Sequence, residues 1–352
     1  MTHRQPARAA FDLSARLDEG PLVCAEGYLF EFERRGYLQA GAYVPEIVLE
    51  HPDLVRGLHE EFVHAGSDIV LAFTYYGHRE KLRIIGKDHL LEPLNRGALE
   101  LATGVAARTD TLAAGNLCNT NAWGPDRAAQ REVRGMFEEQ LTWIAEAGVD
   151  LVVAETFSYA AEALVALEAI RQRGLPAVVT LAVHQADETR DGWSPEEACR
   201  RLAAAGAEVV GLNCIRGPAT MLPLIERIRA AVDTHVAALP VPYRTTATSP
   251  SFQSLHDPDC DCLPADRPFP TALDPFTCNR YEIAAFARAA HGLGVNYLGV
   301  CCGAGPHHIR AMAEALGRTP PASRYSPDMS KHAFLGSDRR LKDHNRSYAG
   351  QL

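Results

Sequence analysis

Short apolar runs alternate with amphipathic stretches along the chain, and the same junction between them recurs. AGSDIVLAF from Ala65, AGVDLVVAE from Ala147, AGAEVVGLN from Ala205 and LGVNYLGVC from Leu293 each pass through a glycine into an apolar, partly β-branched run. Glycine ends helices because it adopts left-handed conformations without a Cβ penalty, and β-branched runs favour strands. The repetition predicts helices that lead into buried strands.

Eight such strands are predicted, at residues 22–30, 69–75, 112–117, 151–157, 177–183, 209–214, 236–240 and 297–301. Between them, apolar residues recur at spacings of three and four, as in the stretches from Pro52, Gln130 and Pro306, each of which closes on glycine. Eight strand–helix alternations favour a closed (β/α)8 TIM barrel of the α/β class over a doubly wound sheet.

Two regions break this rhythm. Residues 243–279 are Pro-rich and without period, which predicts a long loop after the seventh strand. Residues 318–352 are polar and lack a sustained apolar stripe. We therefore predict one barrel over residues 1–317, followed by a C-terminal extension over 318–352 that acts as a lid or a subunit contact.

The charge balance narrows the function classes. The chain has 35 Lys and Arg against 44 Asp and Glu, a net charge of −9, and no basic block, which disfavours nucleic-acid binding. The first twenty residues lack the apolar core of a secretory signal, and no apolar run reaches about 18 residues. We expect a soluble, cytoplasmic protein without a membrane span. Its nine cysteines are then reduced, and metal binding or catalysis explains them better than disulfides.

Three of these cysteines fall at the carboxyl ends of predicted strands, where barrels of this class build their active sites. Cys214 closes the sixth strand in GLNC, and Cys301 and Cys302 close the eighth in GVCCG. Three thiolates with one open position are typical of a catalytic zinc site, so we predict one Zn²⁺ per chain. Cys260 and Cys262 in DPDCDC are spaced outside the common zinc patterns, so a second metal site is the weaker interpretation.

The segments GLNC, GVCCG followed by PHHIRAMAEAL, and GYLFEFERRGYLQAG resemble the homocysteine S-methyltransferase family, and most closely its betaine-homocysteine branch. The resemblance runs over about residues 17–317. It implies a β/α barrel in which the three cysteines hold zinc, and in which the zinc binds the thiolate of homocysteine for methylation to methionine. A free thiol is mostly protonated at neutral pH, and coordination to zinc deprotonates it, so this chemistry is consistent with the cysteine pattern.

The resemblance also implies residue roles. Glu155 matches the glutamate that contacts the amino group of homocysteine, and Tyr76 matches the tyrosine of the donor pocket. Thr156 stands where the betaine branch usually has tyrosine, and Tyr43 where it has tryptophan. A quaternary ammonium group favours aromatic faces, because it cannot donate hydrogen bonds. The aromatic candidates near the first two strand ends are Tyr28, Tyr43, Tyr75 and Tyr76, and packing beneath a lid is the alternative role for each.

The clearest departure from the family lies at the first strand. The family sequence DGG is replaced by Ala25, Glu26 and Gly27, so the aspartate that helps to seat the amino acid is absent. Glu26 is offset by one place, which in a strand means the opposite face unless a bulge re-aims it. Glu26 and Gly27 nevertheless remain candidate substrate contacts.

Three functions stay open from the sequence. The leading hypothesis is methyl transfer from a betaine-like onium donor to homocysteine. The second keeps this chemistry with a sulfonium donor, S-methylmethionine or dimethylsulfoniopropionate, or with another acceptor. The third is an inactive zinc protein that binds an onium ligand or a partner. A homodimer is expected, because the family's betaine branch uses its C-terminal extension for subunit contacts.

Overall fold

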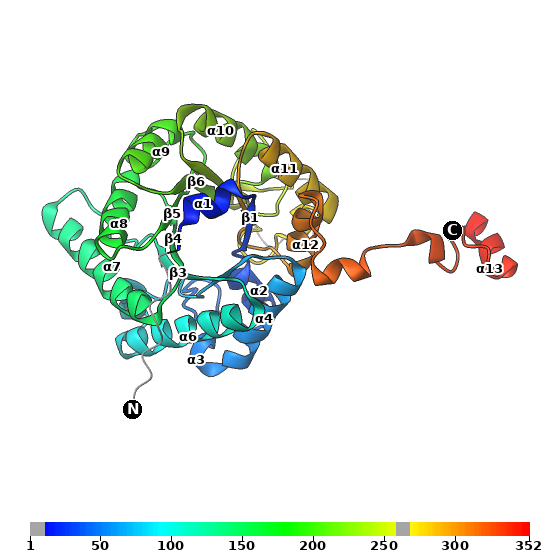
Figure 1. Cartoon of the computed structure of the whole chain (residues 1–352), viewed down its shortest axis with the longest axis horizontal. Helices are drawn as coiled ribbons and strands as arrows, with labels where there is room; N and C mark the ends of the chain where they lie inside the picture. The colour runs from blue at the N-terminus through cyan, green and yellow to red at the C-terminus, as the bar shows by residue number, and fades with distance from the viewer. Residues whose placement is uncertain (1–10, 258–267) are drawn as a thin grey trace.

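The computed structural model describes residues 11–257 and 268–352. Within these ranges eight parallel strands pair in sequence order, and β8 pairs back to β1, so that the sheet closes into a barrel (Figure 1). The predicted (β/α)8 barrel is therefore confirmed. Cys260 and Cys262 lie outside the described residues.

The strands are β1 (Leu22–Ala25), β2 (Ile69–Leu71), β3 (Leu112–Cys118), β4 (Leu151–Phe157), β5 (Ala177–Leu181), β6 (Val209–Asn213), β7 (His235–Leu239) and β8 (Tyr297–Val300). The helices are α1 (Leu13–Asp18), α2 (Tyr28–Arg34), α3 (Ile47–Glu50), α4 (Pro52–Ala65), α5 (Arg79–Ile84), α6 (Leu91–Thr109), α7 (Arg127–Ala147), α8 (Ala160–Gln172), α9 (Pro195–Ala204), α10 (Pro218–Ala231), α11 (Arg280–Gly292), α12 (Pro306–Ala315) and α13 (Asp343–Tyr348). Among the 3-10 turns, η2 covers Phe252–Ser254 and η4 covers Pro321–Tyr325.

The predicted carboxyl ends of the first two strands were too far along the chain by four residues or more, whereas the other strand ends differ from the prediction by at most two residues. The first strand ends at Ala25, not at residue 30, and α2 starts at Tyr28, while β2 ends at Leu71, short of Tyr75. Leu29 and Phe30 are buried on a helix, and a short apolar run does not by itself distinguish a buried strand from a buried helix. The candidates Tyr28, Tyr75 and Tyr76 consequently lie in a helix and a loop above the strands.

The junctions that predicted the barrel have the expected geometry. Gly66 ends α4 with φ 111°, and Gly148 ends α7 with φ 69°, both in the left-handed region that favours glycine. Each junction then enters a strand whose side chains are buried, as in β4, where all seven residues are buried. Because all eight strands of the barrel run parallel, their carboxyl ends lie at one rim.

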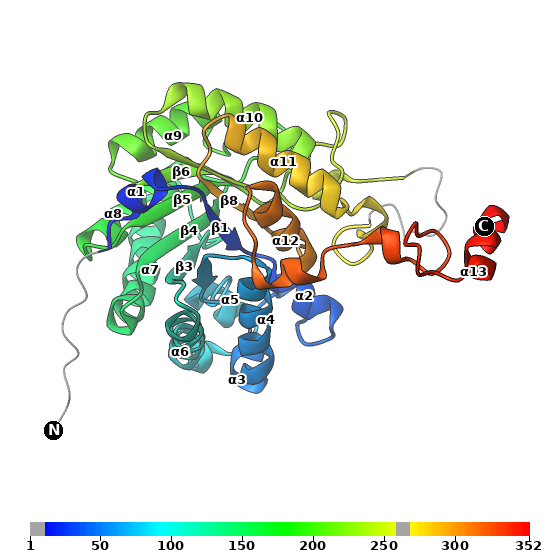
Figure 2. The same ribbon diagram turned by 45° about the vertical axis from the view of Figure 1, so that its right-hand side comes forward.

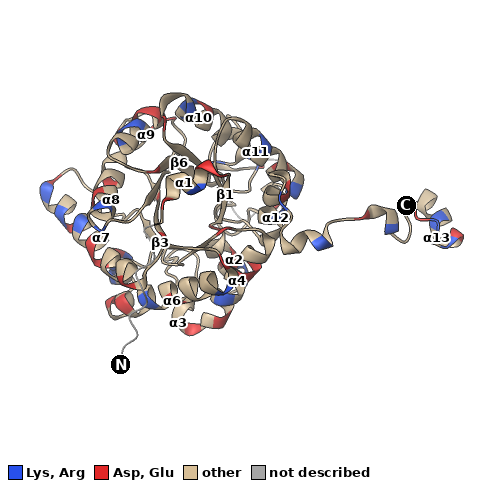
Figure 3. Ribbon diagram, in the orientation of Figure 1, with Lys and Arg blue, Asp and Glu red and all other residues tan. Residues whose placement is uncertain are grey.

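Charged residues lie mainly on the outer helices, with both signs interspersed, and the strands contain few of them (Figure 3). Among the described residues no helix combines the length and the apolar character that a membrane crossing requires. The cytoplasmic location stays a prediction, as does the absence of nucleic-acid binding.

The C-terminal extension leaves the barrel next to α12. Arg318 anchors its start, because both terminal nitrogens of the guanidinium lie 2.5 Å from the carboxylate oxygens of Asp68. After η4 the chain runs outward, and α13 lies apart from the barrel (Figure 2). In this arrangement the extension does not lie across the barrel.

Candidate active site

A cavity opens inside the carboxyl-terminal rim of the barrel. Its lining includes Glu26, Tyr28, Tyr75, Glu155, Cys301 and Cys302. These residues come from four places along the chain, and the closed barrel brings them together. Catalytic sites of this fold lie at this rim, so the cavity is the candidate active site.

The three predicted metal ligands converge at this rim. The Sγ atoms of Cys214, Cys301 and Cys302 all lie within 4.8 Å of one another, and Cys301 Sγ is 3.9 Å from Cys302 Sγ. A tetrahedral zinc ion with Zn–S bonds of about 2.3 Å separates its sulfurs by about 3.8 Å, so the spacing suits such an ion. All three thiols are largely buried, with Cys302 the most accessible. Among the described residues the donor set consists of three soft sulfurs without a fourth cysteine, which leaves one position for a substrate.

The three thiols form hydrogen bonds with one another. The pKa of Cys214 is held well below its usual value because Cys301 and Cys302 donate hydrogen bonds to its sulfur. Burial raises the pKa of Cys301, and hydrogen bonding to Cys214 raises that of Cys302. Of the three thiols, Cys214 is therefore the one whose sulfur accepts hydrogen bonds from the other two.

Two buried carboxylates face each other beside Cys301. Glu26 and Glu155 are only 6% and 3% exposed, and one oxygen of each lies within 4.8 Å of the other and of Cys301 Sγ. Burial is the main cause that raises the pKa of both, to about 7 for Glu155, and the proximity of Glu155 further raises that of Glu26. The offset of Glu26 does not turn it away from the site, because β1 has ended one residue earlier.

Asn213, which the sequence reasoning did not single out, connects these groups. Its Nδ2 donates to Glu155 Oε2 at 2.8 Å and to Glu26 Oε2 at 3.2 Å. Asn116 donates to the other oxygen of Glu155 at 2.6 Å, whereas Glu26 Oε1 is buried without a hydrogen-bond partner among the described residues. Both Asn116 and Asn213 stand inside otherwise apolar strands, and a polar residue in such a place is the feature of the sequence that could have identified them.

The predicted tyrosines fall into separate groups. Tyr28 packs in the core, where its hydroxyl lies 3.1 Å from His59 Nδ1. Tyr75 and Tyr76 form a ring pair with centroids 4.5 Å apart, and the Lys81 ammonium lies 4.0 Å from the Tyr76 ring centroid. Burial is the main cause that raises the pKa of Tyr43, and the nearby Cys302 raises it further.

Phenylalanines that the sequence analysis missed extend the aromatic surface around Tyr43. Phe30 stacks on Tyr43 and on Phe252, with centroids 5.9 Å apart in each pair, and Phe269 lies edge-on to Phe252 at 4.9 Å. Phe252 and Phe269 belong to the long loop after β7. This loop therefore contributes an aromatic wall close to the cysteines.

Backbone strain gathers at the candidate site. Among the described residues, Tyr43, Tyr76, Thr156 and Cys214 have φ between 56° and 64° although none is glycine. A non-glycine residue in this region costs on the order of 1–3 kcal/mol, and such strain is often found at functional sites. Asn213 holds Thr156 in place, since its Oδ1 accepts the Thr156 N–H at 2.8 Å and its Nδ2 donates to Thr156 Oγ1 at 2.8 Å.

Gly27 lies where the chain passes from β1 to α2. A Cβ at this position would meet the carbonyl oxygen of Ala304 at 2.2 Å, so the segment after Glu26 packs directly against the turn that follows Cys301 and Cys302. Only glycine allows this close approach. Gly27 therefore allows the carboxyl end of β1 to lie close to the turn that follows Cys301 and Cys302.

Known proteins resemble this chain over most of its length. The model of the family described as homocysteine S-methyltransferase matches residues 27–316. Betaine–homocysteine S-methyltransferase 1 of Xenopus tropicalis is 36% identical over 344 residues, which cover 94% of this chain and 81% of that protein. S-methylmethionine–homocysteine S-methyltransferase of Pongo abelii is also 36% identical, over 92% of this chain and 85% of that protein.

A solved structure has the same fold. The metallated form of the homocysteine methyltransferase MmuM from Escherichia coli superposes with a TM-score of 0.66 at 17% identity, and the match covers 85% of this chain and 98% of that one. At this identity the likeness bears on the fold alone.

Proposed function

Because the chain belongs to the homocysteine S-methyltransferase family, we propose that it is a zinc-dependent enzyme that transfers a methyl group from a betaine-like onium donor to homocysteine, forming methionine. The observation that carries this proposal is the convergence of the Cys214, Cys301 and Cys302 sulfurs beside two buried carboxylates. One zinc ion per chain fits this donor set. Cys214, Cys301 and Cys302 would hold the ion, and the ion would lower the pKa of the substrate thiol so that it reacts as a thiolate nucleophile.

The carboxylates suit the amino end of the acceptor. An α-ammonium group has three N–H donors, and Glu155 together with the unpartnered Oε1 of Glu26 offers acceptors for them. Glu26 then takes over the task of the aspartate that is missing at Ala25. Asn213 fixes both carboxylates, so the ammonium and the sulfur of one molecule are oriented together.

The methyl transfer itself is an in-line displacement. A lone pair of the acceptor sulfur forms the new bond to the methyl carbon while the bond from that carbon to the donor's onium atom breaks, and its electron pair stays with the donor. No base has to act on the methyl group. The task of the protein is therefore positioning, and the aromatic side chains orient the donor cation.

Two relatives that are both 36% identical to this chain are named for different methyl donors, one for betaine and the other for S-methylmethionine. Tyr43 and Tyr76 support an onium group of either kind. One face of Tyr76 is already occupied by Lys81, so a donor stacks on the other face or on Tyr43. We propose glycine betaine as the main donor and a sulfonium compound as the alternative.

A parallel assay decides between these donors. Methionine formation from homocysteine is measured with glycine betaine, S-methylmethionine and dimethylsulfoniopropionate, and betaine is expected to give the highest kcat/KM. Tyr76→Leu should raise the KM of the donor about 3- to 30-fold, the equivalent of one cation–π contact, with little change in the KM of homocysteine. Tyr281→Leu, at a surface residue 71% exposed on α11, is the control. Turnover with the sulfonium donors alone would reject betaine.

We also propose a homodimer. Large apolar side chains that are exposed gather on the C-terminal extension: Tyr325, Met329, Phe334, Leu335, Tyr348 and Leu352. Exposed apolar surface of this kind supports a subunit contact. Light scattering should give twice the chain mass for the full chain and the single-chain mass for a variant that ends at Gly317. A monomeric full chain would contradict the proposal.

A further inference from the structure

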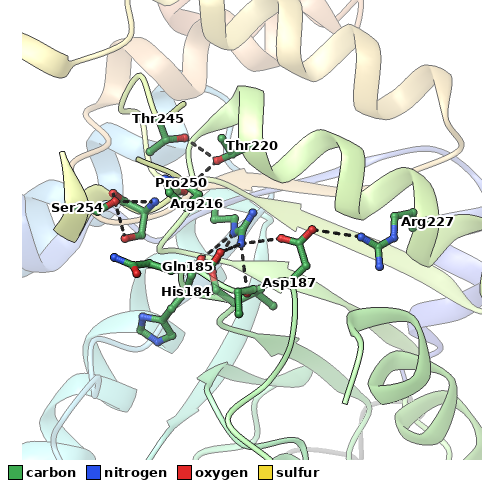
Figure 4. Close-up of polar contacts among 12 residues, drawn as sticks. His184, Gln185, Asp187, Arg216, Thr220, Arg227, Thr245, Pro250 and Ser254 are labelled. Atoms are coloured by element: carbon green, nitrogen blue, oxygen red, sulfur yellow. Dashed lines mark hydrogen bonds and ion pairs between the residues drawn. The ribbon is translucent and has the colours of Figure 1, made fainter. Parts of the chain in front are cut away.

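The guanidinium of Arg216 is buried two residues after Cys214. Its side chain is 6% exposed, and it donates to four consecutive backbone carbonyls of the segment that follows β5 (Figure 4). Nε lies 3.2 Å from Val183 O and 3.0 Å from His184 O, and Nη2 lies 3.1 Å from Gln185 O and 3.3 Å from Ala186 O. One side chain thereby ties the end of β6 to the neighbouring loop.

The turn that Arg216 closes is strained. Cys214 and Ile215 both have left-handed φ angles, of 58° and 59°, and Ile215 is β-branched, for which this conformation is unfavourable. The Arg216 N–H donates to Cys214 O at 2.6 Å, and Arg216 O accepts the Val241 N–H at 3.0 Å. A turn of this kind persists only where its surroundings determine it fully.

The same turn also holds the loop after β7. Ile215 O accepts the N–H of Phe252 at 2.8 Å, and the Gly217 N–H donates to Thr245 Oγ1 at 3.0 Å. Phe252 belongs to the aromatic wall next to Tyr43. The Arg216 turn therefore joins the Cys214 end of β6 to two loops of the rim.

We propose that Arg216 is a positioning residue that fixes Cys214 for metal binding by holding its strained turn against the carbonyls of residues 183–186. The inference rests on the proposed function, because it needs a metal at the three cysteines. The carbonyls carry most of this effect. Asp187 lies 2.9 Å from Nη2, but its side chain is 50% exposed and also contacts Arg227, so water weakens that ion pair.

Zinc affinity is the measurement that tests this role. Arg216→Met keeps the length of the side chain and removes its donors, and it should weaken zinc binding about 10- to 100-fold in competition with a chromophoric chelator, as the loss of residues that support metal ligands commonly does. The visible spectrum of the cobalt(II)-substituted variant should also change, because the Cys214 thiolate moves. Arg227→Met removes the other arginine that contacts Asp187 and leaves the hydrogen bonds of Arg216 in place, so it should leave both the zinc affinity and the cobalt spectrum unchanged.

Arg216→Lys keeps the charge but loses the planar fork of donors, so it should weaken zinc binding at least about fivefold, and it decides the question if Arg216→Met does not fold. Wild-type affinity and an unaltered cobalt spectrum in a folded Arg216 variant would overturn the inference while leaving the proposed function intact. If the wild-type chain itself binds no zinc, the metal site fails, and this inference fails with it.

Discussion

Cys301→Ala is expected to abolish stoichiometric zinc binding and to lower methionine formation by about three orders of magnitude or more. Cys301 contributes a sulfur to the three-thiol cluster, and its sulfur also lies within 4.8 Å of oxygens of both Glu26 and Glu155. Its loss therefore removes a metal ligand and the residue that the cysteine cluster shares with the carboxylate pair. Metal analysis of the purified variant and a discontinuous assay for methionine check both effects.

Cys199→Ala is the matched control. Cys199 is equally buried but lies on α9, so its removal costs packing energy while the cluster stays intact. Full zinc content and near-normal turnover are expected for it. Turnover that survives in Cys301→Ala without bound metal would contradict the role of the cysteines.

Glu155→Gln should raise the KM of homocysteine and lower kcat/KM about 10- to 100-fold. A hydrogen bond to a charged group is worth about 1.5–3 kcal/mol, and the amide removes the charge that attracts the ammonium. Glu26→Gln should act in the same direction, because Glu26 Oε1 is an acceptor without a partner among the described residues. Steady-state kinetics with homocysteine varied at saturating donor measure the effect.

Two further variants sharpen this test. Glu162→Gln changes another buried glutamate, one that accepts hydrogen bonds from Thr120 outside the cavity, and should leave the KM of homocysteine unchanged. The double change Ala25→Asp with Glu26→Gly restores the family pattern and should recover the activity that Glu26→Gln loses. An unchanged KM in both the Glu26 and Glu155 variants would rule out the ammonium contacts.

The barrel was predictable because its signal is repeated. Four glycine-terminated helices are each followed by an apolar, partly β-branched run, and the eight strand–helix alternations that they help to define leave few alternatives to closure. The ends of the strands were harder to predict from the sequence. Beyond Ala25 the apolar residues continue into α2, and neither composition nor spacing marks the change from strand to helix there.

The candidate site, too, could be predicted only in part from the sequence. The cysteine cluster could be predicted from motif and strand position, because Cys214 directly follows β6 and Cys301 directly follows β8, and the carboxyl ends of all the strands meet at one rim. The direction of Glu26 could not, since it depends on where β1 ends. Phe252 is held beside the site by a backbone hydrogen bond to Ile215. Arg216 donates hydrogen bonds to four carbonyls of a segment that lies 30 or more residues earlier in the sequence. Contacts of this kind leave no local pattern in the sequence.

X-ray absorption at the zinc edge tests the central claim most directly, because it counts the sulfur atoms bound to the metal with and without substrate. The account predicts three sulfurs at about 2.3 Å and one lighter atom in the wild-type protein, and four sulfurs after homocysteine is added. Fewer than three sulfurs at the start, or no fourth sulfur with homocysteine, would contradict the activation of the substrate thiol at Cys214, Cys301 and Cys302.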